Sequence, residues 1–303
     1  MSGKLEEKFL ELPVVSWVVD LFQRIELPGF EGLTLFDLME MYIRGIVKGA
    51  VTYRASAISF SFFMALFPFL LFILNLLPYV PIDNFQADFL NLIESLLPPK
   101  TVNYFDNIIE DIVNNQRGGL LSSVFFLSVF LMANGINAIF DGFESSYHVD
   151  INRKMVRQYL VSMGVAVLLS FIILIAVVVF IYLQYLRIVE VEDTDGGVVG
   201  IQLGKAFFFV FISYIITATL YYFGTAEGKK TRFFSPGALL TTVLLVITTY
   251  LFGIYIENFA LYNELYGSIG GLLILMLYIW LNSNLLLLGF ELNAALRSLK
   301  RKN

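Results

Sequence analysis

Residues 267–296 read GSIGGLLILMLYIWLNSNLLLLGFELNAAL, an apolar run whose amide and carboxylate side chains all lie in its second half. A helix that crosses the hydrocarbon core of a bilayer needs about 20 mostly apolar residues, so this run predicts a membrane-spanning helix. Asn282, Asn284, Glu291 and Asn293 are therefore expected in or close to lipid, where a polar group is costly unless it has a partner.

The rest of the chain shares this apolar character. Of its 303 residues, 58% are hydrophobic and only 15% are charged, whereas about a quarter of the residues in a soluble domain carry a charge. Cysteine is absent, which excludes disulfides, thiolate metal sites and a cysteine nucleophile. Most of the chain is therefore expected in a bilayer.

Five further stretches have the length and hydropathy of a membrane span, which makes six in all. The fold class expected is an all-α polytopic membrane protein with six transmembrane helices. The predicted spans are residues 55–77, 120–140, 159–186, 203–223, 236–256 and 267–296.

The basic residues predict the orientation of these spans. Most of the 20 Lys and Arg residues lie before the first span, between spans two and three, between four and five, or after the sixth. Short segments rich in Lys and Arg stay on the cytoplasmic side of a membrane. Both termini are therefore expected in the cytoplasm, and the chain is expected as a multi-pass protein of a bacterial cytoplasmic (inner) membrane.

Three regions follow from this pattern. Residues 1–54 are predicted to hold cytoplasmic and interfacial amphipathic helices, residues 55–296 form the six-helix transmembrane domain, and residues 297–303 form a basic cytoplasmic tail. The loop 78–119 shows helical apolar spacing on both sides of Pro98 and Pro99, which predicts a two-helix extracytoplasmic cap. Residues 187–200, RIVEVEDTDGGVVG, alternate apolar and acidic residues and indicate a β-hairpin.

Motifs for several chemistries are missing. The sequence has no phosphate-binding G-x-x-x-x-G-K-[ST] loop, no H-E-x-x-H and no G-x-S-x-G, so no ATPase, helical zinc protease or serine hydrolase is indicated. His148 is the only histidine, and we interpret it as an interfacial side chain rather than a metal ligand. No cofactor, no nucleic-acid partner and no catalytic residue are predicted.

Polar residues from three spans are expected at one depth, near the cytoplasmic side. Span two ends LMANGINAIFDGFESSYH, where Asn134, Asn137 and Asp141 share one helix face. On span six, Asn284 and Glu291 share one face, while Asn282 and Asn293 lie on the opposite face, which suggests polar contacts on both sides. Span one begins YRASAISFSFFMALFPFLLF, with Arg54, Ser56 and Ser59 at this depth and Pro68 placed to kink the helix.

Two interpretations of these residues stay open. Polar side chains between membrane helices often serve only as packing contacts. Alternatively, these side chains line a polar cavity that opens to the cytoplasm, because ionisable groups within a membrane often mark substrate pathways. In that case Arg54 meets an anionic headgroup or balances Asp141 or Glu291.

Two segments of the chain resemble a known family. The stretch YRASAISFSFFMALFPFLLF, and the closing segment of residues 236–296, resemble the YihY/BrkB family of bacterial inner-membrane proteins over roughly residues 35–298. Ser56 and Ser59 stand where alanines are usual in that family, and Phe290 stands where a small residue is common. In the closing segment, the residues that carry the resemblance are Tyr266, Gly267, Ser268, Trp280, Gly289, Glu291 and Asn293.

The resemblance implies a six-span protein of the cytoplasmic membrane, linked to envelope integrity and to the movement of a solute or a lipid. The family has also carried a ribonuclease label, for which this sequence offers no motif. The function expected is a transporter or lipid flippase without its own ATPase, with membrane lipids and a small solute or lipid substrate as partners. Two alternatives stay open. One is a non-transporting envelope scaffold that binds a partner through its outer cap, and the other is a membrane-bound hydrolase.

Overall fold

The computed structural model describes residues 22–26, 34–48, 50–76, 118–146, 148–149, 153–189, 195–226, 228, 232–258 and 268–302. The expected outer cap lies in residues 78–119, and all of it before Gly118 falls outside the described residues. The first part of the expected interfacial region, residues 1–21, also lies outside them.

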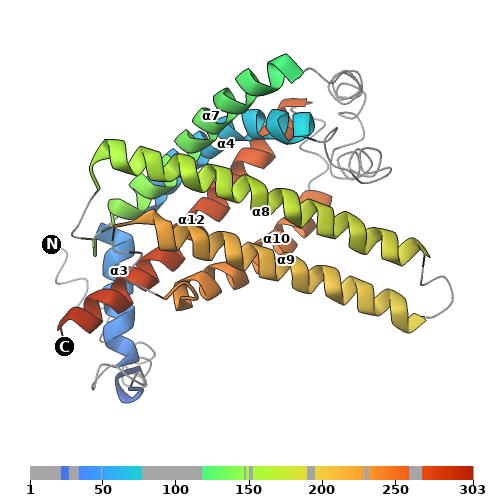
Figure 1. Ribbon diagram of the computed structural model, residues 1–303. Coiled ribbons are helices and arrows are strands. Elements are labelled where there is room, and N and C mark those ends of the chain that lie inside the picture. Colours follow the sequence, from blue (N-terminus) through green and yellow to red (C-terminus); the bar gives the residue numbers. More distant parts are fainter. Residues whose placement is uncertain are drawn as a thin grey trace.

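Seven helices of 14 residues or more account for most of the described residues (Figure 1). The six long helices stand at the six predicted positions, and five of them are long and apolar enough to cross a membrane. In α4, the part whose side chains the structure describes, Val51–Leu66, is apolar as well. The helices are α3 (Leu35–Lys48), α4 (Val51–Leu76), α7 (Gly118–Glu144), α8 (Met155–Val189), α9 (Asp195–Gly224), α10 (Pro236–Asn258) and α12 (Ser268–Lys302).

The described residues contain no β-strand, only an isolated antiparallel bridge between Glu26 and Thr34. The β-hairpin predicted over residues 187–200 is therefore wrong. Helix α8 continues to Val189 and α9 already begins at Asp195, so Gly196 and Gly197 lie within its first turn. The predicted tail, residues 297–303, is also helical up to Lys302, where α12 ends.

Local side-chain contacts explain where two of these helices begin. Thr34 caps α3, because its hydroxyl accepts from the Asp37 backbone N–H at 3.3 Å while the Asp37 carboxylate accepts from the Thr34 N–H at 2.8 Å. Pro236 is the first residue of α10, where a missing N–H costs nothing, and the hydroxyl of Ser235 accepts from the Ala238 N–H at 3.3 Å.

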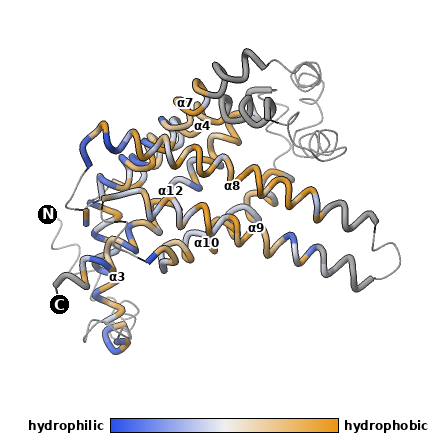
Figure 2. The backbone as a smooth tube through the Cα atoms, viewed as in Figure 1, coloured by the Kyte–Doolittle hydropathy of each residue, from blue (hydrophilic) through white to orange (hydrophobic). Residues whose placement is uncertain are grey.

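The helices pack most closely at one end, which we call the basic end. Here α4, α8 and α10 begin and α7, α9 and α12 end, and Figure 2 shows that hydrophilic residues gather there. Phe143 of α7 stacks on Phe290 of α12, with ring centroids 4.3 Å apart, and Tyr221 of α9 meets both rings edge-on. Helices α8 and α9 run together away from α4 and α7 at the other end (Figure 1).

Large apolar side chains face outward along the long helices. A helix in lipid gains no hydrophobic free energy by burying its apolar residues, since the surrounding hydrocarbon is as apolar as they are. The outward-facing side chains include Phe60, Phe126, Phe171, Ile175, Phe207, Ile247 and Tyr250. Apart from one isolated bridge, the secondary structure of the described residues is helical, and the chain is a multi-pass membrane protein.

Candidate functional site

A buried ion pair joins three helices at the basic end. The Arg54 Nη2 of α4 donates to the Glu291 Oε1 of α12 at 2.6 Å, and these side chains are 7% and 0% exposed. Arg54 Nη1 also donates to the backbone carbonyl of Gly142 at 2.6 Å, in the last turn of α7. Carbonyls in the last turn of a helix lack an intrahelical partner, so Arg54 stabilises the end of α7 as well as the carboxylate.

The second carboxylate oxygen of Glu291 has partners of its own. The Ser146 hydroxyl, just after α7, donates to Glu291 Oε2 at 2.8 Å, and His148 Nδ1 lies 3.6 Å from the same oxygen. We refer to Arg54, Gly142, Ser146, His148 and Glu291 as the Glu291 cluster. Charged groups away from water are tolerated only when they are paired and hydrogen-bonded, and the contacts of Glu291 meet that requirement.

Helix α3 covers this cluster. A Cβ atom on Gly45 would lie 2.8 Å from Glu291 Oε2 and 3.0 Å from His148 Cε1, so only a glycine lets α3 approach this closely. Burial raises the pKa of the Tyr42 phenol, one turn earlier on α3, and the negative charge of Glu291 raises it further. Tyr42 is therefore a neutral hydroxyl next to the buried carboxylate.

The predicted polar face of α7 meets α8 and not the Glu291 cluster. Gln158 of α8 donates to Asn137 Oδ1 at 3.2 Å and to Asp141 Oδ1 at 2.5 Å, while Asn137 donates to the other oxygen of Asp141 at 3.0 Å. Tyr159 donates to Asn134 Oδ1 at 3.1 Å. These five residues form the α7–α8 strip, in which Asn134 and Asp141 keep exposed side chains.

The opposite face of α12 contacts α10. Asn293 Oδ1 accepts from the Gly237 N–H at 2.8 Å, and its amide nitrogen donates to the Ser235 hydroxyl at 2.9 Å. A Cβ on Gly289 would lie 1.9 Å from Thr241 Oγ1, so the two helices touch here without a side chain at Gly289. The prediction that α12 makes polar contacts on two sides is confirmed by these bonds and by those of Glu291.

The remaining predicted polar residues bond within α12 or between α4 and α12. Asn282 and Asn284 each donate to a carbonyl one turn earlier in α12, at 2.8 Å in both cases. Ser56 accepts from Trp280 Nε1 at 3.1 Å, and the Ser59 hydroxyl lies 3.5 Å from the Met276 carbonyl. Pro68 lies within α4, which continues to Leu76.

The structure thus brings Arg54 and Glu291 together and distributes the other predicted residues among separate contacts. Sequence reasoning did not identify Gly45 or Ser146 as functional, and it gave His148 only an interfacial role. Ser146 and His148 follow the end of α7, where helical periodicity no longer predicts the direction of a side chain. A glycine among the apolar residues of α3 was the one available signal for Gly45.

A second set of contacts ties α7, α8 and α9 together at the basic end. The Glu144 carboxylate accepts from the Arg153 backbone N–H at 3.1 and 3.3 Å. The Arg153 guanidinium donates to the carbonyls of Phe223 and Thr225, at 2.6 and 2.5 Å, and so caps the end of α9. Among the residues that the structure describes, no three His, Asp or Glu side chains are grouped to hold a metal ion.

Comparison with known proteins places the chain in a family. No solved structure matches it significantly. A Bacillus subtilis (strain 168) protein named as ribonuclease-like, YfkH, is 29% identical over 251 residues, which cover 82% of this chain and 90% of that protein. A UPF0761 membrane protein of Coxiella burnetii (strain Dugway 5J108-111) is 25% identical over 260 residues, 84% of this chain and 90% of its own length. The family model described as "Virulence factor BrkB" matches residues 42–303, and the chain belongs to this BrkB/YihY family of membrane proteins.

Proposed function

We propose that this protein is a transporter or lipid flippase of a bacterial cytoplasmic membrane, that it has no ATPase of its own, and that the Glu291 cluster is its cytoplasmic gate. In this proposal the chain crosses the membrane six times and both termini lie in the cytoplasm. The orientation rests on the concentration of basic residues at the basic end, as the positive-inside rule requires.

The observation that carries the proposal is the ion pair between Arg54 and Glu291, buried between membrane helices. Stability alone does not favour such a pair, because well-packed apolar residues of similar volume often stabilise a protein as well or better. A pair that can part and re-form, in contrast, suits an element with two conformations. Ionisable groups at this depth are typical of transport pathways.

In this conformation the gate is closed. Arg54 and Glu291 are in direct contact, and α3 lies over them through Gly45. Passage requires that the pair separates, so that water and a substrate reach the polar side chains farther along α12, including Asn282 and Asn284. Ser56 and Ser59 of α4, which contact α12, complete the proposed lining in this conformation. Asn134, Asn137, Asp141 and Asn293 bond to α8 and α10 here, and in this proposal they join the lining only when the helices rearrange.

The test measures flux with the full-length protein in vesicles. Movement of fluorescent phospholipids between leaflets, and uptake of a panel of small solutes, are compared for the native protein, Glu291→Gln and Asp141→Asn. Both substitutions should abolish flux, in the case of Glu291→Gln because a gate that cannot close again cannot complete a transport cycle. Glu40→Gln is the matched control, because Glu40 pairs with Arg44 on the exposed side of α3 and its loss should leave flux unchanged.

A double variant separates gating from folding. Arg54→Met with Glu291→Leu replaces the charges with apolar side chains of similar size, so the protein should insert and stay folded yet transport nothing. If this variant or both single variants transported at the native rate, the gate assignment would be wrong. No described residue favours the scaffold alternative, which depends on residues 78–119.

A further inference from the structure

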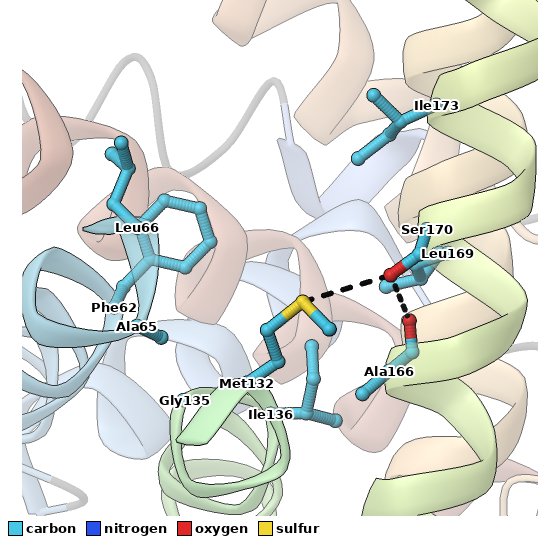
Figure 3. Close-up of a pocket in the computed structure, with 10 residues that line it drawn as sticks. All are labelled: Phe62, Ala65, Leu66, Met132, Gly135, Ile136, Ala166, Leu169, Ser170 and Ile173. Carbon is cyan, nitrogen blue, oxygen red and sulfur yellow. Dashed lines mark hydrogen bonds between the residues drawn. The ribbon is translucent and has the colours of Figure 1, made fainter. Parts of the chain in front are cut away.

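A groove lies between α4 and α8, with α7 as its floor (Figure 3). Its volume is about 100 Å³. Phe62 and Leu66 of α4 form one wall, and Leu169 and Ile173 of α8 form the other. Gly135 of α7 contributes no side chain to the floor of the groove. A Cβ on Gly135 would lie only 3.0 Å from the Cβ of Ala65.

The groove lies near the middle of the membrane. Along α7, Met132 is about 18 Å from the helix end at Glu144, and along α8, Ser170 is about 22 Å from its start at Met155, at 1.5 Å per residue. Both helices are candidate membrane spans, and the hydrocarbon core of a bilayer is about 30 Å thick. The surroundings of the groove are therefore the inner parts of lipid acyl chains.

The lining offers nothing to a polar ligand. Ser170 is the only lining residue with a polar side chain, and its hydroxyl already donates to the Ala166 carbonyl at 2.8 Å and lies 3.6 Å from Met132 Sδ. Dry apolar cavities of roughly 150 Å³ in other proteins take up small hydrocarbons rather than water. A polar solute would lose its hydration in this groove and gain no bond in return.

The dimensions favour a chain over another helix. A helix with its side chains is about 10–12 Å wide, which is too wide for a groove of about 100 Å³ between α4 and α8. An acyl chain is much narrower and is present at high concentration at this depth. Its methylene groups would fill a space that otherwise lacks packing partners on one side.

We propose that this groove binds the hydrocarbon chain of a membrane lipid, with the distal part of the chain between α4 and α8. The proposal goes beyond transport, because it requires only that the helices lie in lipid. It assigns a ligand site to residues that the gate does not use.

Photo-crosslinking tests the site in the full-length protein. Vesicles of phosphatidylcholine contain the protein and a phospholipid with a diazirine near the methyl end of one acyl chain, and adducts are mapped by mass spectrometry after illumination. Adducts on Met132 and Leu169 should exceed those on Phe171 and Ile175, which face outward from α8, severalfold. A probe with the diazirine beside the headgroup should not show this enrichment.

Two substitutions on α8 form a matched pair. Ala166→Leu fills the groove and should abolish the enriched labelling. Gly164→Leu adds the same side chain where no atom lies within 4 Å, and it should leave labelling unchanged. Ser170→Leu fills the groove from the next turn and replaces Ala166→Leu if that variant does not fold.

Three results would overturn the proposal: equal labelling of groove and outward-facing residues, enriched labelling that survives both groove-filling variants, or crosslinks to a second copy of the chain at the groove. Transport is a separate outcome. If the groove is labelled but the protein moves no lipid or solute, the groove proposal stands and the transport proposal is wrong. If the protein transports but the groove is not labelled, the transport proposal stands and the groove proposal is wrong.

Discussion

Arg54 and Glu291 depend on each other, since each is buried and each is the other's charge partner. Removal of one member of such a pair leaves a buried charge without compensation, at a cost of about 3–5 kcal/mol. Replacement of both by apolar residues removes the charges together. We therefore predict that the effects of substitutions at these two positions on the free energy of unfolding are strongly coupled.

We expect Glu291→Gln to lower the free energy of unfolding by about 3–5 kcal/mol, and Arg54→Met with Glu291→Leu to recover most of that loss. Unfolding in mixed detergent micelles, followed by the helical circular dichroism signal, measures both. The exposed Glu40→Gln should change stability by less than about 1 kcal/mol. Independent, additive losses at the two positions would contradict the coupling.

The contact between α10 and α12 depends on two glycines. A Cβ on Gly289 would lie 2.6 Å from the Gly237 carbonyl, and a Cβ on Gly237 would lie 2.1 Å from the Gly289 carbonyl. Neither backbone can move without disturbing the bonds of Asn293 to Gly237 and Ser235. The sequence G-x-E-x-N at residues 289–293 thus places two residues against α10 and one carboxylate against α3, α4 and the segment that follows α7.

We expect Gly289→Ala to destabilise the protein by about 1–3 kcal/mol, the usual cost of overpacking a close contact. The thermal midpoint of the purified protein in detergent measures the change. Gly253→Ala on α10 is the control, because its Cβ would meet no atom within 4 Å and alanine favours the helix. A Gly289→Ala protein as stable as the control would show that α10 and α12 separate at no cost.

The six long helices could be predicted from sequence because lipid imposes a simple rule on length and hydropathy. The rule does not predict where a helix ends once it leaves the hydrocarbon, so α12 continues past the expected end at residue 296 to Lys302. The hairpin prediction failed because α9 likewise extends beyond its predicted bounds, at its N-terminal end. Asp195 is favourable at a helix N-terminus, and α9 extends through the two following glycines.

Helical periodicity also predicted which polar residues share a face, but not which neighbour that face meets. Asn137 and Asp141 do share a face, yet it packs on α8, because α7 lies between α8 on one side and α4 and α12 on the other. For Arg54, charge alone allowed either Asp141 or Glu291 as a partner. Only the packing of α4 against α12 selects Glu291.

At the scale of the whole molecule, buried side chains gather at the basic end, and α3 lies against α12 there. Ser283 of α12 is buried and lies about 12 Å farther from that end than Glu291, at 1.5 Å per residue. A water-soluble reagent on the basic side should reach it only when the Glu291 cluster opens. The absence of cysteine makes single-cysteine labelling a direct measure of this opening.

We expect Ser283→Cys to react slowly with a membrane-impermeant maleimide in the native background and much faster when combined with Glu291→Gln, because the substitution removes one charge of the pair that holds the gate. Arg44→Cys, on the exposed part of α3, should react rapidly in both backgrounds and reports that the reagent reaches the basic side. Labelling rates by gel shift of the reconstituted protein provide the comparison. If Ser283→Cys reacted equally slowly in both backgrounds while Arg44→Cys reacted rapidly, the Glu291 cluster would hold the helices together without controlling access. The buried pair would then be a structural contact.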